Sequence, residues 1–441
     1  MSVFNRDEAD VARGAPALIA LPELGAGKSR DTDARLEEAA GLAEAIGIDV
    51  REKRAFKIRS PRPKTLFGQG QVDAIAEAMR QSEAELLIVD GTVTPIQQKN
   101  LEDATKAKVI DRTGLILEIF GERAATAEGR LQVELAHLDY QQGRLVRSWT
   151  HLERQRGGFG FLGGPGETQI EADRRLIRDR MAKLRRELEA VTRTRSLHRS
   201  RRQKAPWPVI ALVGYTNAGK STLFNRLTRS EVFAENLLFA TLDPTMREIA
   251  LPGLPKAILS DTVGFISDLP TQLVAAFRAT LEEVLAADII VHVRDISHPD
   301  SDAQREDVER VLKELGLLGG LDSDDADEGE GRTGMIEAWN KIDLLGSEEA
   351  ASIRAEAERR ENVVVLSALS GEGVDDLLAC AAAHLRKDAR LQEVTLGAGD
   401  GEAIAWLHQH GEVLHQESEG LETRLLVRIA PAEWERFQSR R

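Results

Sequence analysis

A phosphate-binding loop is the clearest chemical signal in this sequence. The apolar run Val209 to Val213 leads directly into Gly214-Tyr215-Thr216-Asn217-Ala218-Gly219-Lys220-Ser221. Glycines let the backbone turn so that successive N–H groups point at phosphate oxygens, and a helix that begins at Lys220 presents its positive end to them. Lys220 would then reach the β and γ oxygens, and the Ser221 hydroxyl would bind Mg²⁺. We therefore predict a nucleotide phosphate site with Mg²⁺ as its cofactor.

A second candidate strand, Ile258 to Asp261, ends in a carboxylate and is followed by Thr262-Val263-Gly264. Asp261 suits a place just outside the ligands of Mg²⁺, and the N–H of Gly264 can meet the γ-phosphate. A loop held by the γ-phosphate senses whether that group is present. We therefore predict that this segment is a switch.

The base-binding residues are expected after two further strands. Met335 to Trp339 leads into Asn340-Lys341-Ile342-Asp343, and Val363 to Leu366 leads into Ser367-Ala368-Leu369. A carboxylate at Asp343 can accept both N1–H and the N2 amino group of guanine, whereas adenine presents no such donor pair. The backbone N–H of Ala368 could contact guanine O6. The sequence therefore predicts GTP and GDP as ligands and disfavours ATP.

These segments resemble, in order, the G1 to G5 motifs of the translation-factor-related GTPases. The resemblance identifies Phe239-Ala240-Thr241-Leu242-Asp243 as switch I, with Thr241 as its threonine. A hydroxyl there joins the ligands of Mg²⁺ only when the γ-phosphate is present, which makes the loop an order–disorder switch. Thr245 is the alternative, and Thr241 is favoured because the family places its threonine in the Phe-Ala-Thr segment.

The sequence assigns no catalytic residue for hydrolysis. Phe265 follows Gly264 at the position where Ras-like enzymes carry a glutamine that orients water. An apolar side chain cannot polarise water, so intrinsic hydrolysis is expected to be slow. We expect a partner to complete the active site.

Composition limits the class of protein. A chain of 441 residues exceeds the roughly 250 to 300 residues at which single cores stop growing, so several domains are expected. The charged opening and the lack of any run of roughly 20 apolar residues predict a cytoplasmic protein without membrane insertion. The one cysteine, Cys380, excludes an internal disulfide framework and lies in an apolar pattern typical of a buried position.

We predict a multidomain α/β protein with four parts. An N-terminal α/β domain alternates strands at Ala17 to Leu21, Leu86 to Asp90 and Leu115 to Phe120 with helices near Asp33 to Ala45 and Val72 to Arg80. A P-loop GTPase domain with a mostly parallel sheet and a small α+β C-terminal domain follow an antiparallel helical hairpin. The C-terminal part is expected to hold a helix at Glu402 to His410, strands at Glu412 to Gln416 and Thr423 to Ile429, and a final helix. The expected ranges are 1–125 for the N-terminal domain, 126–205 for the hairpin, 206–390 for the GTPase domain and 391–441 for the C-terminal domain.

The hairpin is predicted from two apolar series at helical spacing. These are Leu131, Leu135 and Leu138, and then Ile170, Ile177, Met181, Leu184, Leu188 and Val191. The segment RQRGGFGFLGGPGE between them is too rich in glycine to continue either helix. It would form a flexible tip.

The hairpin is basic within an acidic chain. The net charge of the chain is −14, yet residues 144–204 hold 17 Lys or Arg and 7 Asp or Glu, a local charge of +10. Arg154, Arg156, Arg174 and Arg175 near the tip are the candidate RNA contacts. From charge alone, a solvated coiled coil is an equally good interpretation.

The resemblance extends beyond the nucleotide site and becomes specific to the HflX family, a ribosome-associated branch of these GTPases. It rests on TGLILEIFGERAATAEGRLQVELAHLDY, WTHLERQRGG, GGPGETQIEADRRLIRDR and VGYTNAGKSTLFNRLT, and covers roughly residues 15 to 390. The block from Gly163 to Arg175 is its most distinctive part. The resemblance implies binding to the large ribosomal subunit, a hairpin tip that approaches the peptidyl transferase centre, and splitting of stalled ribosomes under stress.

Two segments depart from the family pattern. Phe159 and Phe161 occupy the tip, where the family usually has aliphatic or shorter sequence. Gly68-Gln69-Gly70-Gln71 lacks the lysine often seen after the second glycine, so we predict no second nucleotide site there.

Three functions remain open from the sequence. The first is a monomeric GTPase whose nucleotide state gates binding to the large ribosomal subunit and its RNA. The second is a nucleotide-gated scaffold for a protein partner, with the hairpin as a coiled-coil interface. The third is an RNA-remodelling ATPase that acts through the N-terminal domain.

Overall fold

The computed structural model describes most of the chain, and the fold is given for those residues only. They are residues 13–25, 30–124, 126–155, 165–202, 207–229, 239, 245–267, 284–317, 334–386, 390–397, 399–420, 422–429 and 431–440. Across these residues, none of the helices combines the length and the apolar character needed to cross a membrane.

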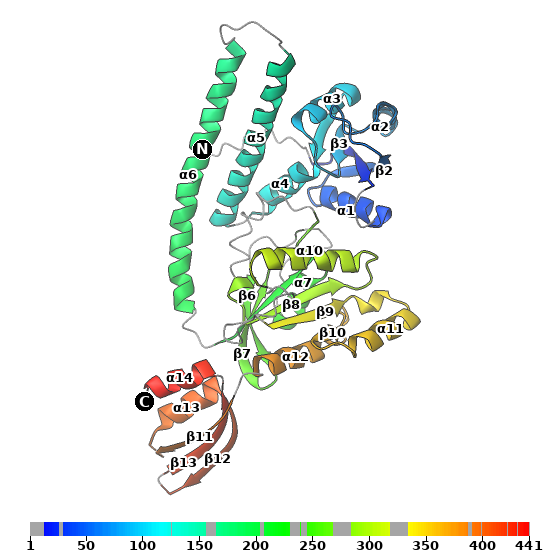
Figure 1. Cartoon of the computed structure of the whole chain (residues 1–441). Coiled ribbons are helices and arrows are strands. Elements are labelled where there is room, and N and C mark those ends of the chain that lie inside the picture. The colour runs from blue at the N-terminus through cyan, green and yellow to red at the C-terminus, as the bar shows by residue number, and fades with distance from the viewer. Residues whose placement is uncertain are drawn as a thin grey trace, which may run out of the picture.

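The N-terminal part is a parallel sheet flanked by helices (Figure 1). Its strands are hydrogen-bonded in the order β2-β1-β3-β4, and each neighbouring pair is parallel. The strands are β1 (Pro16–Leu24), β2 (Asp49–Ile58), β3 (Leu86–Val89) and β4 (Lys108–Asp111). The helices are α1 (Thr32–Glu44), α2 (Gln69–Gln81), α3 (Pro95–Thr105) and α4 (Arg112–Arg123).

The predicted strand at Leu115 to Phe120 is wrong, because these residues lie within helix α4. Asp111 ends β4 and caps the helix, since its carboxylate accepts a hydrogen bond from the N–H of Gly114 at 2.9 Å. Helix α4 packs against both α1 and α5, so apolar residues surround it. A short helix that is buried on all sides has the same unbroken apolar run as a buried strand.

The helical hairpin consists of α5 (Ala127–Gln155) and α6 (Pro165–Arg202), which run antiparallel (Figure 1). Met181 and Leu184 are buried on α6 as predicted. Among the described side chains of α5, the most buried are those of Val133 and Ala136, which belong to a core shared with the N-terminal domain. Both helices extend further into the glycine-rich segment than predicted, because α5 continues through Gln155 and α6 already begins at Pro165, a residue suited to the first helical turn.

The GTPase domain contains a six-stranded sheet in the order β10-β9-β8-β5-β7-β6, in which only the edge strand β6 is antiparallel. The predicted mostly parallel sheet is confirmed. Its strands are β5 (Val209–Gly214), β6 (Thr245–Leu251), β7 (Leu254–Asp261), β8 (Ile289–Asp295), β9 (Gly334–Asn340) and β10 (Val363–Val365). Its helices include α7 (Lys220–Thr228), α10 (Ser301–Glu314), η2 (Ile342–Leu344), α11 (Ser347–Ala357) and α12 (Val374–Arg386).

The C-terminal part is a three-stranded antiparallel sheet in the order β11-β13-β12 with two helices. The predicted helices and two predicted strands are present as α13 (Gly401–His410), β12 (Glu412–Glu419), β13 (Glu422–Ile429) and α14 (Pro431–Arg440). The strand β11 (Arg390–Gly397) was not predicted. Its alternating apolar positions, Val394 and Leu396, are too few to distinguish a strand from a linker.

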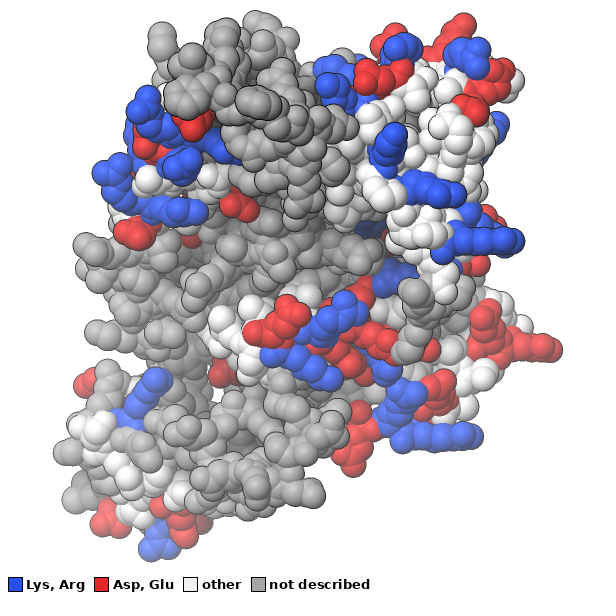
Figure 2. Space-filling model, turned by 45° about the horizontal axis from the view of Figure 1, so that its top comes forward, with Lys and Arg blue, Asp and Glu red and all other residues white. Residues whose placement is uncertain are grey.

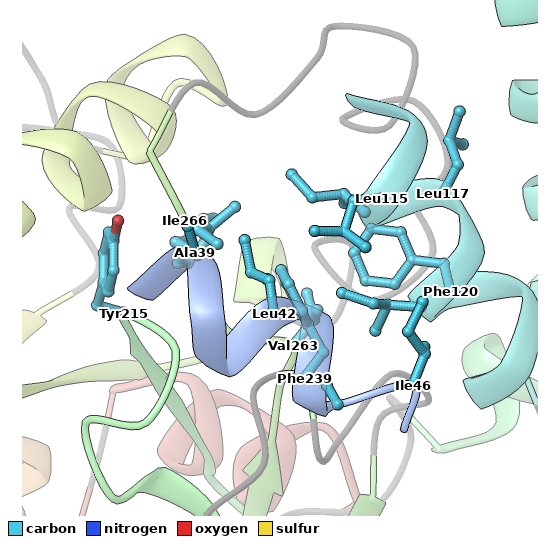
Figure 3. Close-up of a cluster of buried hydrophobic side chains, with 14 of the residues drawn as sticks. Ala39, Leu42, Ile46, Leu115, Leu117, Phe120, Tyr215, Phe239, Val263 and Ile266 are labelled. Carbon is cyan, nitrogen blue, oxygen red and sulfur yellow. The ribbon is translucent and has the colours of Figure 1, made fainter. Parts of the chain in front are cut away.

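One apolar core joins the N-terminal domain to the GTPase domain (Figure 3). Leu42 of α1 and Phe120 of α4 lie in the same buried cluster as Phe239, Val263 and Ile266 from the GTPase domain. The rings of Phe120 and Phe239 meet edge to face with centroids 4.7 Å apart. Apolar burial therefore holds the N-terminal domain against the segments that were predicted to be switches.

Candidate nucleotide site

The phosphate loop connects β5 to α7, as the sequence predicted. Asn217 and Gly219 both have positive φ, at 57° and 96°, which produces the tight turn before the helix. A Cβ at Gly219 would lie 2.1 Å from Nδ2 of Asn340, so only glycine lets the loop approach the base-binding segment this closely.

Lys220 is buried at the start of α7, and its Nζ donates to the carbonyl oxygens of Gly214 at 3.1 Å and Tyr215 at 2.8 Å. Burial lowers the pKa of Lys220 to about 8, although the nearby carboxylate of Asp261 partly opposes this effect. A buried ammonium group beside the N-terminus of a helix is well suited to bind an anion such as phosphate.

Ser221, a predicted Mg²⁺ ligand, lies beside Asp261, which was predicted to sit just outside the ligands, where β5 and β7 run side by side. Leu212 is opposite Asp261 in the parallel register, and Oγ of Ser221 donates to Oδ2 of Asp261 at 2.8 Å. A hydroxyl and a carboxylate supply the oxygen ligands that Mg²⁺ prefers, so these residues fit the ion. Thr262 turns away from this pair, because its hydroxyl donates to the carbonyl of Leu212 at 2.6 Å.

The predicted γ-phosphate sensor, Gly264, lies beside the phosphate loop. A Cβ there would be 2.8 Å from Cγ2 of Thr216 and 3.2 Å from Nζ of Lys220. The next residue, Phe265, bonds to the loop on both sides, donating to Gly214 O and accepting from Thr216 N. The Phe265 side chain is buried in the core shared with the N-terminal domain, so it does not replace a water-orienting glutamine.

Gly264→Ala is expected to weaken binding of a nonhydrolysable GTP analogue by about tenfold or more and GDP binding by less than about threefold. The added methyl group would crowd Thr216 and Lys220 on the side where the γ-phosphate is expected. Affinities for both nucleotides measured by calorimetry test this. Gly346→Ala is the control, because a Cβ at Gly346 meets no atom within 4 Å. Equal losses of GTP analogue and GDP in Gly264→Ala would contradict the sensor assignment.

Switch I is only partly described. Phe239 is buried and has a φ of 58°, whereas Ala240, Thr241, Leu242 and Asp243 lie outside the described residues. The alternative threonine, Thr245, begins β6 and is paired with Asp261 in the sheet register. The choice between the two threonines stays a prediction.

Among the predicted base-binding residues, Asn340 links two loops. Its Nδ2 donates to the carbonyl of Ala218 at 2.8 Å, and its Oδ1 accepts from the N–H of Ala368 at 2.8 Å. The N–H that was predicted to contact guanine O6 is therefore already bonded to Asn340 in this structure. Asp343 is exposed in η2, and Ser367 is fully buried.

Asp295 lies beside the predicted base-binding segment, and the sequence did not point to it. It ends β8, and its Oδ2 lies 2.7 Å from Nζ of Lys341, while its Oδ1 accepts from the hydroxyl of Ser297 at 2.6 Å. Lys341 has a left-handed backbone, with φ at 68°, which is strained for a residue other than glycine. The ion pair with Asp295 helps to hold Lys341 in this conformation. A carboxylate at the carboxyl end of a parallel strand was the signal that could have identified it.

A polar cluster ties the phosphate loop to the N-terminal domain. The hydroxyl of Tyr215 donates to Oε2 of Glu38 at 2.7 Å and accepts from the N–H of Ser267 at 2.8 Å. Nη2 of Arg112 donates to Oγ of Ser267 at 2.8 Å, and Arg112 also pairs with Glu38 and Asp90. The sequence did not predict these contacts, because their partners lie far apart in the chain.

The charges of this cluster compensate one another. Burial alone would raise the pKa of Glu38, but Arg112 and the hydroxyl of Tyr215 outweigh it and hold that pKa below its usual range. Burial raises the pKa of Tyr215, so its hydroxyl stays protonated and can donate. Arg30 of the same domain pairs with Asp307 of α10. The N-terminal domain therefore contacts the phosphate loop, the segment after Gly264, and α10.

The predicted RNA contacts lie on the hairpin. Arg154 is at the end of α5 and Arg174 and Arg175 are near the start of α6, whereas Arg156 lies outside the described residues. Arg175 is exposed and Arg174 is half-buried; no side chain is described for Arg154.

These features together define a P-loop GTPase. They are a six-stranded, mostly parallel sheet, a phosphate loop after β5, an aspartate at the end of β7, and Asn340, which joins the loop after β5 to the loop after β10. Four family models match successive parts of the chain: "GTP-binding GTPase N-terminal" at 33–121, "GTP-binding GTPase Middle Region" at 123–202, "50S ribosome-binding GTPase" at 209–318 and "HflX C-terminal domain" at 352–440. The chain is 48% identical to GTPase HflX of Magnetococcus marinus over 422 residues, covering 95% of this chain and 94% of the relative. It is 41% identical to GTPase HflX of Escherichia coli K12 over 406 residues, covering 91% of each. The chain belongs to the HflX family of GTPases.

Among solved structures, the chain is similar to a GTP-binding protein from Sulfolobus solfataricus in complex with GDP. The sequence identity is 23%, the TM-score is 0.44, and the match covers 85% of this chain and 99% of that one. A second structure, the SsGBP and GDP complex, matches with 23% identity and a TM-score of 0.47, covering 83% of this chain and 97% of that one.

Proposed function

We propose that this GTPase binds the large ribosomal subunit when it holds GTP, hydrolyses GTP with Mg²⁺ as cofactor, and separates stalled ribosomes in the cytoplasm as a monomer. Family membership supports the ribosomal partner, as does the matching model described as a 50S ribosome-binding GTPase. Ser221 and Thr241 would bind Mg²⁺, with Asp261 just outside its ligands, and the ion would neutralise charge on the β- and γ-phosphates. The source of catalytic assistance is proposed to be the partner, because the side chain of Phe265 is apolar and buried in the core shared with the N-terminal domain.

The observation that carries this proposal is the direct contact between switch segments and the N-terminal domain. Ser267, three residues after Gly264, bonds to both Tyr215 and Arg112, and Phe239 packs on Phe120. A γ-phosphate that moves Gly264 would disturb these contacts. Nucleotide state would thereby change how the N-terminal domain and its attached hairpin are held.

The charge of the hairpin supports RNA as the partner. On the described part of α6, the exposed basic side chains are Arg175, Arg178, Lys183, Arg185 and Arg186. At the left edge of the molecule in Figure 2, where Figure 1 places α6, lysine and arginine lie together with several acidic side chains. Basic side chains along one helix suit the phosphates of an RNA cavity.

Sedimentation with purified ribosomal subunits tests the proposal. The protein should pellet with the large subunit in the presence of a nonhydrolysable GTP analogue, and less with GDP. Binding to neither subunit, with capture of a protein instead, would favour the scaffold function. ATP-dependent RNA unwinding without GTP would favour the N-terminal ATPase function.

Tyr215→Phe is expected to uncouple the domains while leaving GDP affinity within about threefold of the parent, because only the hydroxyl that joins Glu38 to Ser267 is lost. Hydrogen exchange of α1 and α4 amides, compared between GDP and a GTP analogue, measures the coupling. The nucleotide-dependent difference should shrink. Tyr140→Phe is the matched control, since its buried hydroxyl donates to Asp111 at 2.6 Å without reaching the GTPase domain. An undiminished difference in Tyr215→Phe would show that coupling follows another route.

A further inference from the structure

Arg226 connects the phosphate-binding helix to the base-binding loop. It lies in the last turn of α7, whose first turn carries Lys220 and Ser221. Its Nε donates to the carbonyl of Ala368 at 2.6 Å, and its Nη2 donates to the carbonyl of Leu369. One guanidinium group therefore holds two consecutive carbonyls of the loop through two different nitrogens, a fixed planar geometry that a flexible lysine does not reproduce.

The loop is shaped to receive this guanidinium group. Gly371 has a φ of 97°, and a Cβ on it would lie 2.6 Å from Nη1 of Arg226. The loop also closes on itself, because Gly371 N donates to Ser367 O at 2.8 Å and Ser370 N donates to Ser367 Oγ at 3.0 Å. Arg226 thus fixes a loop that is already compact.

The carbonyl contacts determine where the N–H groups of the loop point. No cis peptide bond occurs in the described residues, and carbonyl and N–H point in opposite directions across a trans peptide. Because Arg226 draws the Ala368 carbonyl toward α7, the N–H of Leu369 points away from α7. The N–H of Ala368 is bonded to Asn340, whereas that of Leu369 has no acceptor within the described part of the chain.

We propose that Arg226 is a positioning residue for guanine recognition, which aims the N–H of Leu369 at O6 of the bound base. The inference rests on the guanine site assigned to Asp343, which would bind N1–H and the N2 amino group, and adds a contact to the neighbouring O6. A donor at that position attracts the O6 acceptor of guanine and disfavours the amino group that adenine carries there. Since α7 also carries Lys220, Arg226 fixes the distance between the base loop and the phosphate-binding residues.

The test compares GDP, 6-thioguanosine diphosphate and inosine diphosphate in the full chain. The thio analogue replaces O6 by sulfur, a weaker acceptor, while it keeps the N1 and N2 donors; the inosine analogue lacks the N2 amino group that Asp343 would bind. Arg226→Gln should weaken GDP binding by about tenfold and thio analogue binding by less than about twofold. The preference for GDP over the thio analogue should therefore fall. The preference for GDP over inosine diphosphate should not change.

Two further variants test whether the change in preference for GDP over the thio analogue comes from the contacts of the Arg226 guanidinium group. Arg226→Lys keeps the charge but replaces the planar guanidinium group by a single nitrogen on a flexible chain, so it should give an intermediate preference for GDP over the thio analogue. Arg354→Gln is the matched control, because Arg354 pairs with the exposed side chain of Glu372 in the same loop at 2.6 Å and should leave the preference unchanged.

Ratios of affinities within one variant do not depend on the fraction of folded protein. If Arg226→Gln weakens GDP and the thio analogue equally, or neither, Arg226 does not position an O6 donor and the proposal is overturned. If the parent itself binds GDP and inosine diphosphate alike, the guanine site at Asp343 is wrong, which overturns the proposal by a separate route.

Discussion

Asp343→Asn is expected to convert this GTPase into a protein that prefers xanthosine triphosphate, with GTP affinity lowered by about 100-fold or more. The carboxylate would accept two donors from guanine, and an amide cannot accept both. Xanthine carries a carbonyl at the position of the guanine N2 amino group, and the new amide can donate to it. In the structure, the exposed side chain of Asp343 has no ion-pair partner among the described residues, so the substitution breaks no structural contact.

Competition between labelled GTP and unlabelled xanthosine triphosphate measures this exchange. Asp302→Asn is the control, because Asp302 is also an exposed carboxylate of the GTPase domain but pairs with Arg294 at 2.8 Å. It should leave the base preference intact. An unchanged preference for GTP in Asp343→Asn would remove Asp343 as the base-specificity residue.

The nucleotide site could be predicted from the sequence because its signals are local. Each binding segment directly follows an apolar strand, and the carboxyl ends of parallel strands meet at one edge of a sheet. The structure places the loops after β5, β9 and β10 close enough for Asn340 to bond to both Ala218 and Ala368. Short-range patterns were therefore sufficient to predict that these loops lie together, and the role of each residue in binding nucleotide stays a prediction.

The contacts between domains could not be predicted, because each depends on residues distant in the chain. In the sequence, Tyr215 is only one of the residues of the phosphate loop, and nothing near it indicates a partner in another domain. Its hydrogen bond to Glu38 depends on how α1 packs on the GTPase domain. The same applies to Arg226, which is 142 residues from Ala368. The error at α4 has a related cause, because tertiary packing on several sides removed the polar face that distinguishes a surface helix.

Replacing Arg154, Arg156, Arg174 and Arg175 together with glutamine is expected to leave GTP affinity unchanged and to weaken binding to the large ribosomal subunit sharply. Each arginine can contribute one phosphate contact, so the salt dependence of log K should flatten by up to about three to four units of slope. Ala218 of the phosphate loop and Leu223 of α7 pack in a core that contains no residue of the hairpin, so GTP affinity has no reason to change.

Subunit binding at several salt concentrations, measured beside GTP affinity, tests the role of the hairpin. The matched control replaces Arg178, Lys183, Arg185 and Arg186, which are exposed on α6 further from the tip and remove the same charge. If the tip enters an RNA cavity, the four tip substitutions should reduce the slope more than the control does, because counterion release depends on direct phosphate contact. Equal reductions would indicate a general electrostatic attraction along α6. A slope equal to that of the parent in both variants would exclude the basic hairpin as the RNA contact and make a protein scaffold the better interpretation.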